Sequence, residues 1–308
     1  MIFRRLGCVF GKEQFAGFSS HAQVPTAIEL KDRVRVYYAA RNGRGKSFTT
    51  YADFDRGNPG KLIGKSESPV MIQGKPGTFD EDGNMPSQAI WDGDRILMFY
   101  SGWNQKVSTP YHNSTGLAES RDGGETFQRV FEGPVMERTP LEPYVAVTPS
   151  ILKDEAGFHC WYVSGLRWID VAGKYEPVYV IKAAHSPDGI RWERDGRQVI
   201  PSLFENEAFS RPTVLKRNGV YHMLFCARGS EDYRGGTQAY KLGYATSFDG
   251  VNWERHDSRL ELAGPREEWE SNMTCYPFHI RLGERDFIYY NGNGFGQSGF
   301  GLARLEWT

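Results

Sequence analysis

The apolar residues of this chain fall into short runs that recur about every 63 residues. One run of each repeat opens with a proline, at positions 25, 86, 149, 212 and 277, so successive prolines lie 61, 63, 63 and 65 residues apart. Proline is tolerated at the first residue of a strand, where no ladder N–H is needed. An aromatic run follows 13 or 14 residues later and ends at Tyr38, Tyr100, Tyr162, Cys226 and Tyr290. The repeat predicts two buried strands in each unit.

A third strand in each repeat ends in a turn of the form Ser-x-Asp-Gly. Complete copies carry Asp122, Asp188 and Asp249, each followed by an aromatic residue that starts a fourth strand, and residues 53–57 form a weaker copy. Asp accepts local backbone N–H groups in such turns, and Gly supplies the positive φ. Four strands repeated five times predict an all-β fold, a five-bladed β-propeller.

The predicted propeller is a single domain over residues 1–308. Its blades are expected near residues 14–72, 73–137, 138–201, 202–263 and 264–308. The last repeat stops after its third strand, and residues 2–10 form an N-terminal strand that can complete this blade. Closure of the ring in this way removes exposed strand edges.

Composition and charge exclude several classes of partner. The 37 Lys and Arg residues balance 38 Asp and Glu residues, a net charge of −1, so we expect no nucleic-acid partner. No run reaches the ~18 apolar residues of a membrane helix, so we expect no membrane partner. The N-terminus lacks the apolar core and cleavage site of a secretion signal, so we expect a cytoplasmic protein with four reduced cysteines. No feature of the sequence indicates an oligomeric state.

Metal and cofactor chemistry have no support in the sequence. The seven histidines show no His-x-x-x-His spacing, and no glycine-rich phosphate loop is present. We therefore predict no metal site and no cofactor.

Carboxylates recur in the segments that lead into the proline-opened strands. Asp80, Glu142, Glu207 and Glu270 lie five to seven residues before their prolines, so four blades present a carboxylate from nearly the same place. Glycoside hydrolysis uses two carboxyl groups, one as acid and one as base or nucleophile. We predict that these four residues supply the pair, with Glu176 in reserve.

The loops between the second and third strands reach the same end of the propeller and are polar and aromatic. Aromatic faces beside amide, guanidinium and carboxylate groups are typical of carbohydrate sites, so we expect a carbohydrate or a sugar-derived small molecule as ligand. The predicted binding residues are His21, Trp103, Asn104, Tyr111, His112, Asn113, Arg167, Tyr179, Arg211, Arg228, Tyr233, Arg234, Tyr240, Asn272, Asn291 and Asn293.

The fivefold pattern with Ser-x-Asp-Gly-x-x-Trp turns resembles the five-bladed propeller glycosidase clan, which includes arabinanases, β-xylosidases, invertases and levansucrases. More narrowly, residues 79–86, 102–104, 110–113, 176–179, 210–212 and 290–294 resemble propeller proteins often labelled glycosylase and encoded near bacterial surface-polysaccharide genes. The resemblance covers nearly the whole chain and implies the fold more specifically than the reaction.

The sequence departs from that clan at one important position. Two catalytic aspartates of the clan commonly stand just before a strand-opening proline. The corresponding residues here are Val24, Met85, Thr148, Arg211 and Tyr276, none of them acidic. The clan's nucleophile or base therefore has no counterpart at these positions.

Several functions fit this pattern. A glycoside hydrolase or related glycosyl-transforming enzyme is the first hypothesis, and a non-catalytic glycan-binding propeller is the second. Residues 120–127 match the Asp-box turn common in sialidases, so sialidase-like chemistry is a third, beside lyase, phosphorylase or transferase chemistry.

The arginines point to an anionic ligand. Arg167, Arg211, Arg228 and Arg234 all lie in segments expected at the ligand end of the third and fourth blades. A guanidinium matches the geometry of carboxylate and phosphate groups. We predict an acidic sugar or a sugar phosphate; alternatively, these arginines pair with Glu142, Glu176 and Glu207 and leave the pocket neutral.

Overall fold

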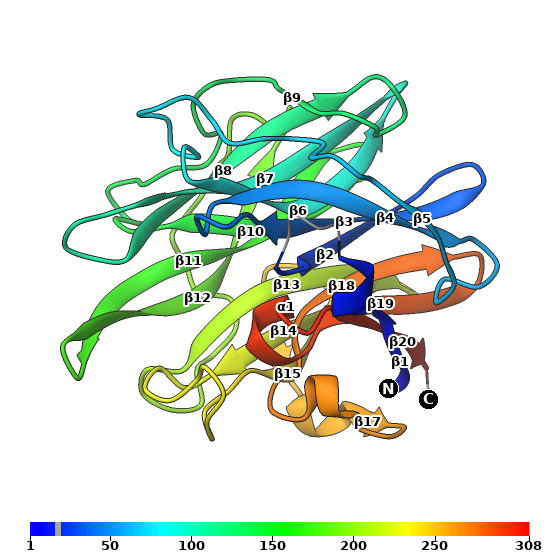
Figure 1. The fold of residues 1–308 in the computed structure, drawn as a ribbon. Helices are drawn as coiled ribbons and strands as arrows, with labels where there is room; N and C mark the ends of the chain where they lie inside the picture. The colour runs from blue at the N-terminus through cyan, green and yellow to red at the C-terminus, as the bar shows by residue number, and fades with distance from the viewer. Residues whose placement is uncertain (16–19, 308) are drawn as a thin grey trace.

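The computed structural model describes residues 1–15 and 20–307, whose regular secondary structure is almost entirely β-strand (Figure 1). Within these residues no helix has the length and apolar character needed to cross a membrane. The helical segments are short: Lys12–Gln14, Asp257–Arg259, Glu268–Glu270 and α1 (Asn293–Gly296). The four cysteines are free thiols, as expected.

The strands pair as consecutive antiparallel ladders, each strand beside the next in sequence. The first ladder holds β2 (Gln23–Glu29), β3 (Arg33–Arg41), β4 (Ser47–Asp55) and β5 (Leu62–Lys65). The second holds β6 (Gly83–Asp92), β7 (Arg95–Gln105), β8 (Tyr111–Ser120) and β9 (Gln128–Arg129). The third holds β10 (Ala146–Asp154), β11 (Gly157–Val171) and β12 (Lys174–Ser186). The fourth holds β13 (Ala208–Arg217), β14 (Val220–Arg228), β15 (Lys241–Ser247) and β16 (Glu254–Arg255).

The last ladder joins the two ends of the chain. It holds β18 (Cys275–Leu282), β19 (Arg285–Asn291) and β20 (Phe300–Glu306), and β1 (Ile2–Phe10) pairs antiparallel with β20, the pairing expected for residues 2–10. β17 (Glu261–Ala263), which the sequence placed in the fourth repeat, instead pairs parallel with β1. The boundary expected near residue 263 therefore moves towards the N-terminus, because β1 still has a free edge on its outer side.

Apolar side chains hold neighbouring ladders together. Each large core cluster combines residues of two ladders that are adjacent in sequence, and one cluster joins the last ladder to the first. The second strands lie at the centre of these clusters: Tyr38, Tyr100, Tyr162, Cys226 and Tyr290 are all fully buried. The aromatic runs in the sequence thus correspond to strands covered on both faces.

The first strand of each ladder is interrupted at its proline. A register shift, the mark of a β-bulge, occurs at this place in β2, β6, β10, β13 and β18. The residue before the proline has a positive φ in four of the five: 52° for Val24, 48° for Thr148, 41° for Arg211 and 55° for Tyr276. Side chains other than glycine rarely adopt this conformation, which costs about 1–3 kcal/mol and persists only where the surroundings impose it.

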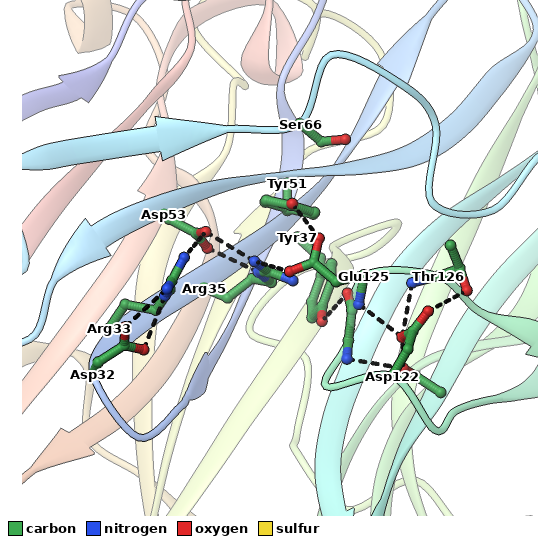
Figure 2. A network of polar contacts seen from close by, with 12 residues as sticks. Asp32, Arg33, Arg35, Tyr37, Tyr51, Asp53, Ser66, Asp122, Glu125 and Thr126 are labelled. Atoms are coloured by element: carbon green, nitrogen blue, oxygen red, sulfur yellow. Dashed lines mark hydrogen bonds and ion pairs between the residues drawn. The ribbon is translucent and has the colours of Figure 1, made fainter.

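The Ser-x-Asp-Gly turns connect neighbouring ladders. In the turn after β8, the Asp122 carboxylate accepts hydrogen bonds from Ser120 Oγ at 2.7 Å and Thr126 Oγ1 at 2.6 Å. Glu125 of this turn accepts a 2.6 Å hydrogen bond from Tyr51 Oη and pairs with buried Arg35 at 2.8 Å, both from the first ladder (Figure 2). The Asp-box motif is therefore a structural turn that fixes one ladder against the next.

Candidate functional site

A pocket of about 390 Å³, the central pocket, lies where the first strands of all the ladders meet. The first strands contribute Gln23, Val24, Met85, Val147, Thr148, Ser210 and Tyr276. The second and third strands and the loops that follow them contribute Arg41, Trp103, Tyr111, Asn113, Val163, Tyr179, Arg228, Tyr233, Arg234, Tyr240 and Phe295. Of the sixteen predicted binding residues, this set contains Trp103, Tyr111, Asn113, Tyr179, Arg228, Tyr233, Arg234 and Tyr240.

Side chains of the preceding ladder hold the bulged backbone at the pocket. The N–H of Val24 donates to Asn291 Oδ1 at 2.7 Å, and the N–H of Thr148 donates to Ser101 Oγ at 3.0 Å. Asn291 Nδ2 also donates to the Ala22 carbonyl at 2.8 Å. Asn291 is fully buried, so the predicted ligand contact is instead a clamp between the last and first ladders.

Two arginines of the pocket have no carboxylate partner. Arg228, only 3% exposed, donates to the Pro177 carbonyl at 2.9 Å and to Tyr240 Oη at 3.1 Å, and its guanidinium lies 3.6 Å from the ring centre of Tyr233. Arg41 donates to Gln23 Oε1 at 2.8 Å, and burial lowers its pKa. Within residues 1–15 and 20–307, neither side chain has a carboxylate oxygen within 4 Å. The pocket wall therefore carries two guanidinium groups without a direct carboxylate partner among the described residues, and the nearby Glu176 interacts with Arg228 only at longer range.

Glu176 lies immediately behind this wall. Its carboxylate accepts a 2.6 Å hydrogen bond from Tyr233 Oη and forms an ion pair with Arg234, whose Nη2 lies at 2.9 Å. Burial alone raises the pKa of such a carboxyl, but the Arg234 and Tyr233 contacts outweigh it and hold the pKa of Glu176 below its usual value. Burial also raises the pKa of Tyr233. The phenol therefore stays protonated and donates a hydrogen bond to the ionised carboxylate of Glu176.

Two residues of the pocket lining carry side-chain oxygens without a protein partner among the described residues. The side-chain oxygens Asn113 Oδ1 and Thr148 Oγ1 are buried and have no hydrogen-bond partner in the part of the chain that the structure describes. Tyr111 and Tyr179 share a 2.6 Å hydrogen bond between their hydroxyl groups. Buried polar atoms are nearly always paired in native proteins, so the two free oxygens indicate acceptors available to a ligand.

The four carboxylates predicted as acid and base lie inside their ladders, not in the central pocket. Each is buried and pairs with an arginine: Asp80 with Arg129 of β9, Glu142 with Arg194 in the segment after β12, Glu207 with Arg255 of β16, and Glu270 with Arg5 of β1. In three ladders a tyrosine of the second strand also donates to the carboxylate: Tyr100, Tyr162 and Tyr290. The shared offset from the proline therefore marks a repeated ion pair, the ladder latch, and Glu176 alone of the predicted carboxylates contacts pocket residues.

Two predicted arginines bind protein groups away from the pocket lining. Arg211 is 2% exposed and donates to the Pro25 carbonyl at 2.9 Å and to Thr26 Oγ1 at 2.7 Å, which ties the fourth ladder to the first. Burial lowers the pKa of Arg211 to about 9. Arg167 donates to Asn206 Oδ1 at 2.7 Å. The expected pairing of these arginines with carboxylates occurs for Arg234 and Glu176 only.

The remaining predicted residues do not line the central pocket. His21 contacts Ser20, the Oδ1 of Asn104 is buried without a partner among the described residues, and the Asn293 Oδ1 accepts from the N–H of Asn272. His112 lines a neighbouring cleft.

Pocket residues that were not among the predicted binding residues include Val24, Met85, Thr148, Tyr276 and Arg41. Val24, Met85, Thr148 and Tyr276 line the pocket although none is acidic, and each lies at or beside the register shift of its strand. Arg41 follows Tyr38 by three residues, the same offset as Trp103 from Tyr100. That register was therefore a usable signal for Arg41.

Known structures share this fold. A structure described as a glycoside hydrolase superposes with a TM-score of 0.75 at 17% identity, covering 99% of this chain and 93% of that one. A thermostable family-43 glycoside hydrolase gives 0.65 at 17% identity, over 95% of this chain and 92% of that one. A third structure superposes with a TM-score of 0.68 at 16% identity, covering 99% of this chain and 93% of that one. Its description reads "The GH130 family of mannoside phosphorylases contains glycoside hydrolases that target beta-1,2 mannosidic linkages in Candida mannan". The fold is thus that of glycosidase-like propellers, as the sequence resemblance implies.

Sequence comparison is more specific about descent. No family model matches the chain. Two Mycobacterium tuberculosis proteins, "Uncharacterized protein MT1551" of strain CDC 1551 / Oshkosh and "Uncharacterized protein Rv1502" of strain ATCC 25618 / H37Rv, are each 33% identical over 309 aligned positions, covering 99% of this chain and 100% of the relative. With this identity over the full length of both partners, the chain belongs to the same family as the mycobacterial proteins MT1551 and Rv1502.

Proposed function

We propose that the protein is carbohydrate-active and binds an anionic saccharide in the central pocket. The observation that carries this proposal is the presence of two guanidinium groups, Arg228 and Arg41, in the pocket wall without a carboxylate partner among the described residues. A buried charge is costly unless it is paired, and a carboxylate or phosphate of the ligand supplies the missing partner. A ligand with a uronic acid, a nonulosonic acid or a sugar phosphate carries such a group.

The other pocket groups suit the sugar part of the ligand. Trp103, Tyr111 and Tyr240 offer aromatic faces, and Asn113 and Thr148 offer unpartnered oxygens to ring hydroxyls. The structural neighbours described as glycoside hydrolases support a saccharide as the ligand class.

The reaction we propose is transformation of a glycosidic bond that uses Tyr233 and Glu176. The described pocket lining contains no Asp or Glu, so a pair of carboxylates on either side of the bond has no support in this geometry. Tyr233 lines the pocket and donates to ionised Glu176, which makes this pair the group best placed to exchange a proton with the ligand. Lyase and sialidase-like chemistry on an acidic sugar fall within this proposal.

A non-catalytic glycan-binding protein is the second candidate. The bidentate contact of Arg234 with Glu176 favours it, because this contact also suits a carboxylate that serves only to orient Tyr233 and Arg234.

The architecture that positions the pocket is also part of the proposal. The ladders are the five blades of a single propeller domain, with β1 as the strand that closes the ring. Support comes from the core clusters, each of which links successive ladders and one of which links the last to the first.

Calorimetric titration tests charge recognition directly. Each acidic sugar is compared with a neutral counterpart: glucuronate and glucose 1-phosphate with glucose, galacturonate with galactose, and N-acetylneuraminate with its methyl ester. We expect at least one acidic sugar to bind more tightly than its neutral counterpart. We expect Arg228→Met to lower the affinity for that acidic sugar about 10- to 100-fold, because hydrogen bonds to charged groups contribute about 1.5–3 kcal/mol. Arg191→Gln, in an exposed turn, is the matched control and leaves the affinity unchanged. Equal affinity for acidic and neutral sugars would refute the charge-recognition proposal.

Two substitutions separate turnover from binding. For a glycoside of the best-binding acid, Tyr233→Phe and Glu176→Gln are expected to lower kcat by about 10²–10⁴-fold, because that is the usual contribution of a positioned acid or base. If wild type turns the glycoside over and both variants keep that activity, Tyr233 and Glu176 are excluded as the proton-exchanging pair. No turnover by wild type, together with tight binding, would favour the non-catalytic candidate.

A further inference from the structure

A second cleft of about 250 Å³ adjoins the central pocket. Tyr111, at the start of β8, lines both cavities, so one side chain forms their common wall. Side chains alternate along a strand, and the two residues after Tyr111 divide accordingly: Asn113 lines the central pocket and His112 the second cleft. The two cavities therefore adjoin at Tyr111.

We propose that this second cleft is a subsite for the next sugar residue of a saccharide whose acidic unit occupies the central pocket. The inference rests on the proposed function and adds to it that the ligand is an oligosaccharide or polysaccharide end, not a free monosaccharide. The aromatic residues Trp168 and Tyr144 and the residues Pro143 and Val145 give the cleft an apolar lining. A pyranose ring presents apolar C–H faces that fit such a surface.

The position of Trp168 depends on the longest hairpin of the structure. β11 and β12 have 15 and 13 residues, and the end of this hairpin extends beyond the neighbouring strands (Figure 1). Trp168 on β11 packs edge-on against Tyr111, with ring centres 5.5 Å apart and an interplanar angle of 68°. The hairpin therefore brings an indole from the third ladder to the rim of a cleft that begins in the second.

The remaining lining groups suit a hydroxylated ligand. Ser108 and Thr109 lie on the loop before β8, and Lys106 on the same loop has no carboxylate within 4 Å among the described residues. Aromatic faces surrounded by hydroxyl and ammonium donors distinguish a saccharide subsite from a purely apolar groove.

The polar cluster in this cleft is not arranged as a catalytic triad. His112 Nε2 lies 2.8 Å from Glu137 Oε1 and 3.2 Å from Ser114 Oγ. A triad needs the carboxylate on one ring nitrogen and the hydroxyl on the other, whereas both contacts here use Nε2. Ser114 also donates to Glu137 at 2.7 Å and is fully buried. The cluster therefore supports the cleft wall, which is consistent with a binding subsite.

The test compares a monosaccharide with the same acid extended by one or more residues. Two ligand series are titrated by calorimetry: galacturonate with digalacturonate, and N-acetylneuraminate with sialyllactose. We expect the extended ligand of the recognised series to bind wild type more tightly than the monosaccharide. We expect Trp168→Ala to weaken the extended ligand about tenfold, equivalent to about 1.4 kcal/mol, and to leave the affinity for the monosaccharide within about twofold.

Two further variants keep this result interpretable. Tyr144→Ala removes the second aromatic residue of the cleft without touching Tyr111, and we expect it to weaken only the extended ligand as well. Tyr175→Ala is the matched control, since Tyr175 lies near the tip of the same hairpin, is 48% exposed and lines neither cavity. We expect it to change neither affinity.

The possible failures differ from one another. Equal binding of mono- and extended ligands to wild type, or an equal loss of both in Trp168→Ala and Tyr144→Ala, would overturn the subsite while leaving the proposed function in place. A lack of binding by every acidic ligand in both series would refute the proposed function and the subsite with it.

Discussion

Asp80→Asn tests the ladder latch, because it removes one charge from a buried ion pair and nearly preserves the shape of the side chain. Asp80 is fully buried and accepts from Arg129 at 2.7 Å, from Thr78 Oγ1 at 3.0 Å and from Tyr100 Oη at 3.2 Å. The amide retains one acceptor oxygen but turns an N–H₂ group towards donors. Arg129, whose side chain is only 20% exposed, loses its sole carboxylate partner among the described residues.

The expected magnitude follows from that geometry. Breaking a buried ion pair by removing one partner costs about 3–5 kcal/mol. The unfolding entropy of a 308-residue chain at its midpoint is about 0.65 kcal/mol per kelvin, so we expect the Tm to fall by about 5–8 °C. Asp32→Asn is the matched control, because the Asp32 side chain is 64% exposed and pairs with Arg33 on the surface; its effect should stay below about 0.5 kcal/mol.

The assay is urea and thermal denaturation of wild type and both variants, followed by saccharide titration at a temperature where all are folded. The structural interpretation requires a lower unfolding free energy and unchanged ligand affinity and turnover in Asp80→Asn. Unchanged stability with a loss of turnover of about 100-fold or more would refute it and restore Asp80 as an acid–base residue.

Three further predictions concern pH and packing. Arg5→Met removes the cation that pairs with buried Glu270. Burial already raises the pKa of Glu270, so without Arg5 its ionised form is less stable still, and the variant's unfolding free energy should fall further below that of wild type as the pH rises above about 4.5. Denaturation between pH 4 and 8 measures this difference. Asp122→Asn should show its pH dependence in a lower range: burial opposes ionisation of Asp122, but the turn's hydrogen bonds lower its pKa from 3.8 to about 2, so wild type should be more stable than the variant above about pH 4 and lose this advantage towards pH 2. Gly301→Ala should lower the unfolding free energy by about 1–3 kcal/mol, because the new Cβ would lie 2.4 Å from the ring of Trp269; a variant as stable as wild type would contradict this packing.

The strand pattern was predictable from sequence because it depends on local periodicity. The prolines marked the bulged first strands, the aromatic runs ending at Tyr38 and Tyr100 marked the buried second strands, and the Ser-x-Asp-Gly motif marked the turn at Asp122. The displaced strand β17 was not predictable in the same way, since its partner β1 lies about 260 residues away in the chain.

The site was predictable only in part, because the same residue type serves two purposes. Asp80 and Glu176 are both buried carboxylates paired with arginine, yet only Glu176 contacts residues that line the pocket. Sequence spacing showed that Asp80 belongs to a repeat, but it did not show which way the side chain points. The loop aromatics Tyr111 and Tyr233 were easier to identify, because each lies in a polar segment that no core position explains.

The bulged pre-proline positions also bear on how this protein can change its ligand over evolutionary time. Valine, threonine, arginine and tyrosine share the positive φ at this position in four of the five repeats, so that local geometry does not depend on one particular side chain. Neighbouring ladders hold the backbone through contacts such as those of Asn291 and Ser101. Selection or an engineer can therefore exchange Val24, Met85, Thr148 or Tyr276 one repeat at a time, with each exchange altering one sector of the pocket surface, while Arg211 stays to hold the fourth ladder against the first.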